Sequence, residues 1–269
     1  MNGRPVALTI AGTDSGGGAG VAADLKTFEA HDVWGTAAVV AVTAQNTLGV
    51  QAYEAVSPEL VRAQIASVVS DIGVNAAKTG MLASLELVEA VAQAVRDLGV
   101  QPLVVDPVMV SKHGNRLLDE GALETMWLSL LPMATVVTPN MDEASALAGF
   151  PVVDRATMEE AGSVLAGVGP RVVMITGGHL DDKDQSPDLL VADGRLTWLE
   201  GPRVPGRHTH GTGCVLSAAI CAELARGMEP ADACVAAKQF VARAVGAGFH
   251  LGAGVGPVDP GWERRASPT

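Results

Sequence analysis

Residues 6–20 of the chain read VALTIAGTDSGGGAG, and this stretch decides the fold. The apolar run Val6–Ala11 is typical of a strand buried on both faces. Gly12–Gly20 follows, a run whose backbone can approach a ligand closely or simply turn, and it leads into a helical stretch that contains Asp24. The run lacks the Lys-Ser/Thr pair of a phosphate loop, and Val21 stands where a dinucleotide fingerprint needs glycine. A strand, a glycine-rich turn and a helix predict the first unit of a parallel α/β sheet.

The same alternation of short apolar runs and amphipathic stretches continues along the chain. It predicts an α/β fold, a parallel sheet between layers of helices, in a single domain over residues 1–258. Residues 259–269 are expected to form a flexible tail. An Asp-Gly turn at Asp193 predicts a hairpin over Leu189–Leu199. Further strands are predicted at Ala37–Thr43, Leu103–Asp106, Thr135–Thr138 and Val172–Thr176, and helices at Pro58–Ser70, Ser84–Leu98, Asp119–Leu131 and Met158–Val168.

Composition restricts the class of protein. The 269 residues carry a formal net charge of −12, and only five are lysines, so we expect no nucleic-acid partner. No segment reaches the ~18 consecutive apolar residues of a membrane span. Three clustered cysteines are too few for a disulfide framework. We therefore expect a soluble, cytoplasmic protein that binds anionic ligands through backbone amides, helix N-termini and a cation.

Polar side chains follow several of the predicted strands, where ligands bind in α/β sheets. Gln45 can both donate to and accept from the edge of a pyrimidine, although a single loop Gln is more often a turn residue. Asp106 could bind Mg²⁺, or could cap its own loop. Asn140 and Glu143 are spaced as a helix capping box, which competes with a role in metal and phosphate binding.

The most informative segment is Thr209–Cys214, which precedes a helical run. Gly211 and Gly213 allow backbone amides to converge at the start of that helix, an arrangement that binds anions. Cys214 lies in the first turn, where the helix dipole is expected to lower its thiol pKa. An anion hole beside a proton acceptor suits phosphoryl transfer to a hydroxyl. A zinc site made by His208, His210 and Cys214 is a rival interpretation, but the paired Cys-x-x-Cys spacing is absent.

Taken together, these loops resemble the hydroxymethylpyrimidine/phosphomethylpyrimidine kinases of thiamine biosynthesis, in the ribokinase-like superfamily. The similarity runs from about Val6 to about Val258. It is carried by eight segments in the family's order: AGTDSGGGAG (Ala11–Gly20), ADLKTF (Ala23–Phe28), TAQNT (Thr43–Thr47), KTGML (Lys78–Leu82), DPVM (Asp106–Met109), TPN..EA (Thr138–Ala144), GGHL (Gly177–Leu180) and HGTGC (His210–Cys214).

The resemblance implies an αβα sandwich, a homodimer, and two successive ATP-dependent phosphorylations of 4-amino-5-hydroxymethyl-2-methylpyrimidine. It implies Mg²⁺ and leaves room for a monovalent cation such as K⁺. It implies a pyrimidine pocket made by Gln45, Asp24, Met81 and Val108, and an anion hole made by Gly211, Thr212 and Gly213 with Cys214 as the catalytic cysteine. It also implies a nucleotide site made by Asn140, Thr176 and Lys112, and a metal site made by Asp106 and Glu143.

Two positions depart from the family's pattern. Thr176 stands where the family usually has a lysine near the ATP phosphates, so Lys112 or another cation would have to compensate. Ala22 stands where glutamine is common, which would slightly alter the pocket. A pyridoxal or pyridoxine kinase of the same fold remains an alternative, as does a protein that binds pyrimidines or nucleotides without catalysis.

Overall fold

The computed structural model describes residues 3–109 and 120–266. Its central element is a sheet of eight strands in the order β10-β9-β8-β7-β6-β5-β1-β2. The strands from β8 to β2 pair in parallel, whereas β9 pairs antiparallel with both β8 and β10. Their bounds are β1 Val6–Ala11, β2 Trp34–Val39, β5 Ala76–Thr79, β6 Leu103–Val105, β7 Val136–Val137, β8 Val172–Ile175, β9 Asp188–Ala192 and β10 Arg195–Leu199.

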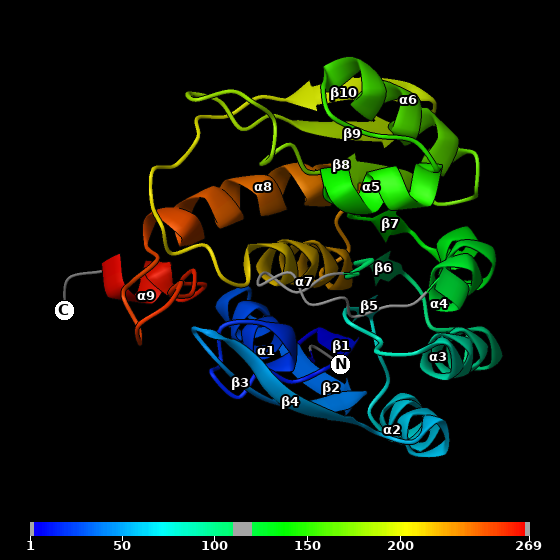
Figure 1. The fold of residues 1–269 in the computed structure, drawn as a ribbon. Coiled ribbons are helices and arrows are strands. Elements are labelled where there is room, and N and C mark those ends of the chain that lie inside the picture. The colour runs from blue at the N-terminus through cyan, green and yellow to red at the C-terminus, as the bar shows by residue number, and fades with distance from the viewer. Residues whose placement is uncertain (1–2, 110–119, 267–269) are drawn as a thin grey trace.

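Helices cover both faces of this sheet, which confirms the predicted αβα sandwich. Figure 1 shows α7 and α8 on one side of the central strands and α2, α3 and α4 on the other. One buried cluster joins the sheet to α1 Gly20–Ala30, α7 Thr212–Ala225 and α8 Pro230–Gly246. The other joins it to α2 Pro58–Asp71, α3 Leu85–Asp97, α4 Glu120–Thr125, α5 Met141–Ala148 and α6 Arg155–Ala166.

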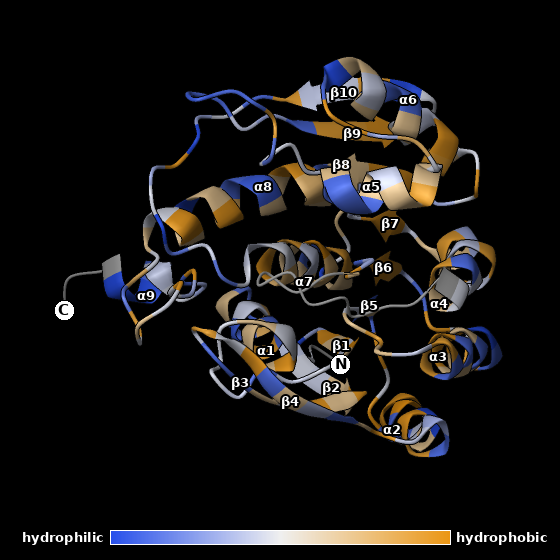
Figure 2. Cartoon of the chain, viewed as in Figure 1, coloured by the Kyte–Doolittle hydropathy of each residue, from blue (hydrophilic) through white to orange (hydrophobic). Residues whose placement is uncertain are grey.

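Alternation along the strands assigns each side chain to one face. Leu8 and Ile10 belong to the cluster with α2–α6, and Ala7 belongs to the cluster with α1, α7 and α8. Strands β6, β7 and β9 are strongly hydrophobic (Figure 2), as expected for strands covered on both faces. Lys78 breaks the rule, because this lysine lies in β5 and is fully buried.

The predicted strand Ala37–Thr43 is wrong as a single element. The chain leaves the main sheet after β2, and β3 Ala41–Asn46 pairs instead with β4 Gly49–Ala55 as a separate two-stranded sheet. Val40 is the junction, since its N–H bonds Ala11 and its carbonyl accepts from Val56. The apolar run continues through this change of partner, so the sequence pattern does not reveal it.

Two other segments differ from their predictions. The predicted helix Asp119–Leu131 ends its α-helical part at Thr125. It continues as a wider, π-helical turn over Met126–Leu130 and a tighter 3-10 turn over Leu131–Met133. Residues 259–266 are not the expected loose tail. Helix α9, Trp262–Ala266, is held because Arg265 forms an ion pair with Asp259, a buried carboxylate.

The Asp-Gly hairpin is confirmed. Strands β9 and β10 are joined by Asp193 and Gly194, which both have positive φ, as a tight hairpin turn requires. Among residues 3–109 and 120–266, none of the helices is both long and apolar enough to cross a bilayer.

Candidate active site

The candidate site residues gather at the carboxyl ends of the parallel strands. Asp106 follows β6, Thr138–Asn140 follows β7, and Thr176 follows β8. The glycine-rich loop follows β1, and helix α7 packs against β1, β5 and β6. Because parallel strands all end at one edge, the fold itself brings these segments together.

The glycines that are expected to form an anion hole lie at the first turn of α7. Gly211 is its N-cap residue and has φ 83°, a conformation that suits glycine. A side chain at Gly211 would collide with the carbonyl of Gly18, so two glycine-rich loops touch here through their backbones. Thr212 donates its hydroxyl to the Thr209 carbonyl at 2.8 Å, and Gly213 is exposed. The first amides of a helix have no partner within it, so this turn is where the fold offers a candidate anion site.

Cys214 is half-buried beside this turn, but its expected acidity is wrong. Burial raises the pKa of the Cys214 thiol to about 12. The charge of Lys78 and a hydrogen bond from the Gly20 N–H, 3.4 Å from Sγ, act in the opposite direction but do not outweigh burial. The helix dipole therefore does not make this group a thiolate at neutral pH.

Asp24 does not line a pocket as expected, because its side chain is fully buried and already paired. Lys78 donates to Asp24 Oδ1 at 3.2 Å and to Oδ2 at 3.1 Å, and the hydroxyl of Thr9 donates to Oδ2 at 2.6 Å. Burial acts to lower the pKa of Lys78, but the charge and hydrogen bond of Asp24, together with nearby groups that include Asp106, raise the pKa above its ordinary value. Lys78 is thus a permanent cation beneath the site.

Asp106 lies next to this ion pair. Its Oδ2 is 4.0 Å from the Lys78 ammonium and accepts the Ser217 hydroxyl at 2.9 Å. Ser217 belongs to α7, so the hydrogen bond joins the end of β6 to the helix that carries the anion hole. Burial raises the pKa of Asp106 despite the opposing effect of Lys78.

Asn140 and Glu143 form the capping box of α5, as their spacing predicts. Each side chain accepts the backbone N–H of the other at 2.9 Å. Burial, and then the charge of Asp106, raise the pKa of Glu143 to about 8. Asn140 is also paired with Thr176 as an isolated parallel bridge, which brings the expected nucleotide-contacting residues of two strand ends side by side.

The residues expected to hold the pyrimidine flank the glycine-rich loop. Gln45 lies half-buried in β3, where its N–H donates to the Ser15 hydroxyl and its carbonyl accepts from it, both at 2.8 Å. Met81 packs against Gly12, whose missing side chain leaves room for the thioether. Val108 is half-buried two residues after Asp106. Lys112 lies outside the described residues.

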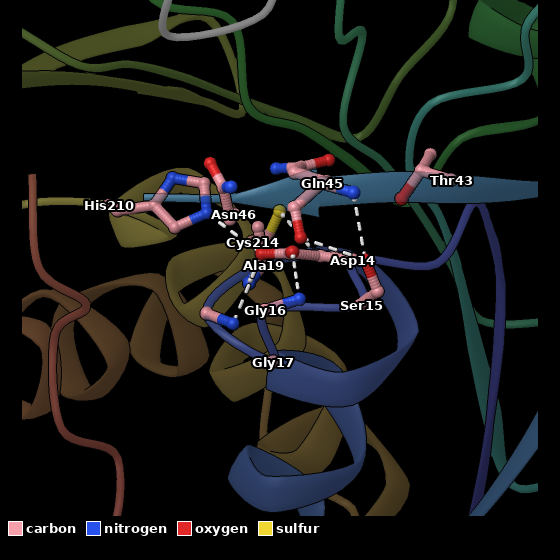
Figure 3. A network of polar contacts seen from close by, with 12 residues as sticks. Asp14, Ser15, Gly16, Gly17, Ala19, Thr43, Gln45, Asn46, His210 and Cys214 are labelled. Carbon is pink, nitrogen blue, oxygen red and sulfur yellow. Dashed lines mark hydrogen bonds and ion pairs between the residues drawn. The ribbon is translucent and has the colours of Figure 1, made fainter. Parts of the chain in front are cut away.

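The glycine-rich loop holds a carboxylate of the protein itself. Asp14 accepts the N–H groups of Gly16, Gly18 and Ala19 at 2.8, 3.1 and 2.9 Å, and His210 Nε2 lies 2.8 Å from its Oδ2 (Figure 3). Burial opposes ionisation of Asp14, but the hydrogen bonds from His210 and Gly16 outweigh it and lower its pKa. These amides are therefore occupied by Asp14, which leaves the first amides of α7 as the candidates for binding an anion.

The rival zinc site does not assemble. His208 Nδ1 accepts the Gly256 N–H at 3.1 Å, whereas His210 faces Asp14 and the Cys214 sulfur faces Gly20. In the part of the chain that the structure describes, no three His, Cys, Asp or Glu side chains form a metal-binding group. Two carboxylates with an electrostatic interaction, Asp106 and Glu143, suit Mg²⁺ better, because Mg²⁺ takes few protein ligands and fills its shell with water and phosphate oxygens.

An orphaned polar atom supports that fit. The hydroxyl of Thr138 is buried and has no hydrogen-bond partner among the described residues. In the parallel register of β6 and β7, where Val105 faces Val137, Thr138 stands next to Asp106 and on the same face. Such a hydroxyl would be satisfied by a hydrated cation or a phosphate oxygen.

Three residues of this network have no role of this kind in the sequence analysis. Lys78 and Asp14 occur there only within motifs, and His210 occurs within a motif and as a ligand of the rival zinc site. The signal for Lys78 was a lysine inside a short apolar strand, which is rarely buried unless paired. For Asp14 and His210 no signal exists, because 196 positions separate them in the chain.

Comparisons with known proteins identify the family of the chain. The family profile described as phosphomethylpyrimidine kinase matches residues 14–259. A hydroxymethylpyrimidine/phosphomethylpyrimidine kinase of Streptomyces coelicolor is 51% identical over 258 residues, 96% of this chain and 95% of that protein. A similar solved structure is a Bacillus subtilis pyridoxal kinase in an ADP complex, with 37% identity and a TM-score of 0.91 over 97% of this chain and 99% of that one. Another is a Clostridium difficile phosphomethylpyrimidine kinase, with 37% identity and a TM-score of 0.80 over 90% of this chain and 100% of that one. The chain belongs to the phosphomethylpyrimidine kinase family.

Proposed function

We propose that this protein transfers the γ-phosphoryl group of ATP to the hydroxymethyl group of 4-amino-5-hydroxymethyl-2-methylpyrimidine, and then phosphorylates the monophosphate to the diphosphate. The product would enter thiamine diphosphate biosynthesis. The observation that carries this proposal is the N-terminus of α7. This helix begins with the glycine amides and Cys214, and its Ser217 donates to Asp106. Kinases of this name from several organisms, up to 51% identical, support it.

In the proposed reaction, the hydroxymethyl oxygen attacks the γ-phosphorus and the bond to the β-phosphate oxygen breaks. Negative charge spreads over the γ-phosphoryl oxygens, and the amides of Gly211–Gly213 would stabilise it. Because burial keeps Cys214 as a neutral thiol, it would orient the hydroxyl by hydrogen bonding rather than act as a strong base. A loose transition state needs little help with the proton until late in the transfer, when the hydroxyl proton leaves to an oxygen of the transferred phosphoryl group or to water.

Asp106 and Glu143 would hold Mg²⁺ at the phosphates, with Thr138 beside them. When bound, the ion would neutralise phosphate charge. Asn140 and Thr176 would contact the nucleotide, and Thr176 can donate a hydrogen bond but cannot supply charge. Gln45, Met81 and Val108 would hold the pyrimidine against the glycine-rich loop.

A second candidate function is phosphorylation of pyridoxal. The observation in its favour is that pyridoxal kinases of Bacillus subtilis and Staphylococcus aureus share this fold at TM-scores of 0.91 and 0.90, with 37% and 35% identity. The pyrimidine relatives are closer in sequence, so we place the pyrimidine first.

Assembly and location belong to the same proposal. The β3–β4 hairpin exposes Val42 (55%), Leu48 (63%) and Tyr53 (58%), and a second copy of the chain could cover this surface in a homodimer. Light scattering would give the mass in solution. Cys214, Cys221 and Cys234 are all free, which suits the reducing cytoplasm.

The deciding experiment measures ADP release with purified protein, ATP and Mg²⁺. The hydroxymethylpyrimidine, its monophosphate and pyridoxal would be supplied separately, and we expect kcat/KM for the pyrimidine to exceed that for pyridoxal about tenfold or more. A preference for pyridoxal would transfer the assignment to the second candidate. ADP release that no acceptor stimulates would reject both.

A further inference from the structure

The tripeptide Thr13-Asp14-Ser15 connects two parts of the site that come from distant segments of the chain. Its alternate side chains bond in different directions, as Figure 3 shows for Asp14 and Ser15. Thr13 and Ser15 bond the backbone of β3, whereas Asp14 bonds His210 next to the anion hole.

On the side of β3, the hydroxyls of Thr13 and Ser15 bond backbone groups of β3 that a third strand would otherwise pair with. Thr13 Oγ1 accepts the Thr43 N–H at 3.0 Å, and the Thr43 hydroxyl donates to the Thr13 carbonyl at 2.8 Å. Two residues on, the Ser15 hydroxyl bonds both the N–H and the carbonyl of Gln45. A two-stranded sheet is marginal by itself, so the position of Gln45 depends on this attachment.

On the side of the anion hole, Asp14 and His210 form a buried pair. The Asp14 carboxylate can only accept, so His210 Nε2, 2.8 Å away, carries the proton between them. The His210 backbone is fixed as well, because its N–H donates to Gly256 at 3.1 Å and its carbonyl accepts from Val258 at 3.0 Å. His210 directly precedes Gly211, the N-cap of α7.

We propose that Asp14 and His210 are a positioning pair that fixes the anion hole relative to Gln45, the residue proposed to hold the substrate. The inference rests on the proposed function. Neither side chain needs to touch a reacting atom. Asp14 is within the glycine-rich loop that holds β3, and His210 directly precedes α7. The hydrogen bond between Asp14 and His210 therefore sets the distance between β3, which carries Gln45, and the first turn of α7. A displacement of about 1 Å between bound reactants can cost about 10²-fold in rate.

The pair is proposed to position and not to relay protons. The Asp14 carboxylate accepts three backbone N–H groups in addition to His210, and its lowered pKa keeps it ionised. This distinction makes a direct test feasible. Glutamine at position 210 can offer an N–H donor near the place of Nε2 but does not titrate, whereas phenylalanine fills the space of the ring without a donor.

The test compares His210→Phe and His210→Gln with the wild type, using His250→Phe, an exposed histidine, as the control for mutation itself. We expect His210→Phe to lower kcat about tenfold or more, with Kd for the pyrimidine alone and for ADP alone changed by less than about threefold. His210→Gln should recover most of kcat and keep the wild-type dependence of kcat on pH. Asp14→Asn carries the same test if His210→Phe does not fold.

Hydrogen exchange gives a readout that does not require turnover. In His210→Phe, amides of residues 14–20 and 209–214 should exchange faster, while those of β8 should not change. Wild-type kcat in His210→Phe would overturn the proposal, and so would a His210→Gln variant as slow as His210→Phe, since that result would require the imidazole proton. If the wild type phosphorylates no pyrimidine, the proposed function fails. Hydrogen exchange in His210→Phe still tests the pair in that case: faster exchange at residues 14–20 and 209–214 supports a positioning role, and unchanged exchange contradicts it.

Discussion

The Lys78 ammonium lies 3.1 and 3.2 Å from the two carboxylate oxygens of Asp24, and neither side chain is exposed to solvent. Asp106 is 4.0 Å from the same ammonium, so one cation lies between two carboxylates beneath the anion hole. A buried charge is tolerated only when paired, and this arrangement explains how an acidic chain can carry a lysine inside its central sheet.

Removal of one partner of this ion pair should destabilise the fold. Lys78→Met leaves Asp24 buried and uncompensated, so we expect the free energy of unfolding to fall by about 3–5 kcal/mol in urea denaturation. The double variant Lys78→Met with Asp24→Asn should lose much less, because no lone charge remains. Equal losses in the single and double variants would contradict the pairing as the source of stability.

Cys214 should react slowly with electrophiles. Because burial raises its pKa to about 12, only about one thiol in 10⁴ is ionised at pH 8, and the thiolate is the reactive form. We expect iodoacetamide to modify Cys214 at least about tenfold more slowly than free cysteine, measured by mass spectrometry of the peptide. Modification at the rate of free cysteine would show that the thiol is acidic after all. Cys221 and Cys234, both buried, serve as unreactive internal controls.

Gln45 should contribute to affinity for the pyrimidine and not for the nucleotide. Gln45→Ala leaves polar groups of the ring edge unpaired, a loss of about 1–3 kcal/mol in binding. Calorimetry with the pyrimidine and, separately, with ADP would measure both. Gln51→Ala on β4 is a matched control, since its amide bonds Asn46 and Gly49 of the same hairpin. Unchanged pyrimidine affinity in Gln45→Ala would move the pocket elsewhere.

Thr176→Lys should preserve or raise kcat/KM for ATP. The substitution supplies a positive charge next to Asn140, which is proposed to contact the nucleotide, and charge that develops on the γ-phosphate would be stabilised there. Thr176→Met introduces a long side chain without a charge, so it should not raise kcat/KM for ATP. If Lys112 compensates for the missing charge, Lys112→Ala should matter less in the Thr176→Lys background. A fall in kcat/KM with Thr176→Lys would show that the site does not lack a cation.

Glu143 should make metal-free stability depend on pH. Its pKa is raised from 4.5 to about 8, so the folded protein binds the extra proton between these values and its stability falls as pH rises through that window. Thermal unfolding in EDTA should therefore give a larger decrease in Tm from pH 5 to pH 8 for the wild type than for Glu143→Gln, which stays neutral. Identical pH dependences would mean that Glu143 is ionised throughout.

Local pattern was sufficient for the fold class and for several of its elements. Val6–Ala11 was predicted to the residue, because a continuous apolar run between polar segments has few other solutions. The Asp193-Gly194 turn and the capping box at Asn140 were equally local, since each depends on residues within a few positions of one another. Motif order then indicated the family, and the comparisons confirmed it.

Partners distant in the chain were decided only by the tertiary structure. The division of Ala37–Thr43 between two sheets depends on which strand lies alongside, and the apolar letters are the same in either case. The pKa of Cys214 is raised, although the sequence predicts a lowered one. The position of the thiol in a helix can be inferred from the sequence, whereas its desolvation by burial cannot.

The sequence by itself determined the alternation of strands and helices, the glycines at the strand ends and the identity of the groups available for chemistry, since these follow from periodicity and residue type. Only the tertiary structure decided that Asp24 is paired with Lys78 and that Asp14 occupies the amides of the glycine-rich loop and meets His210. Burial and electrostatic pairing depend on distances between side chains, and the chain fixes those distances only when its parallel strands bring their carboxyl ends to one edge.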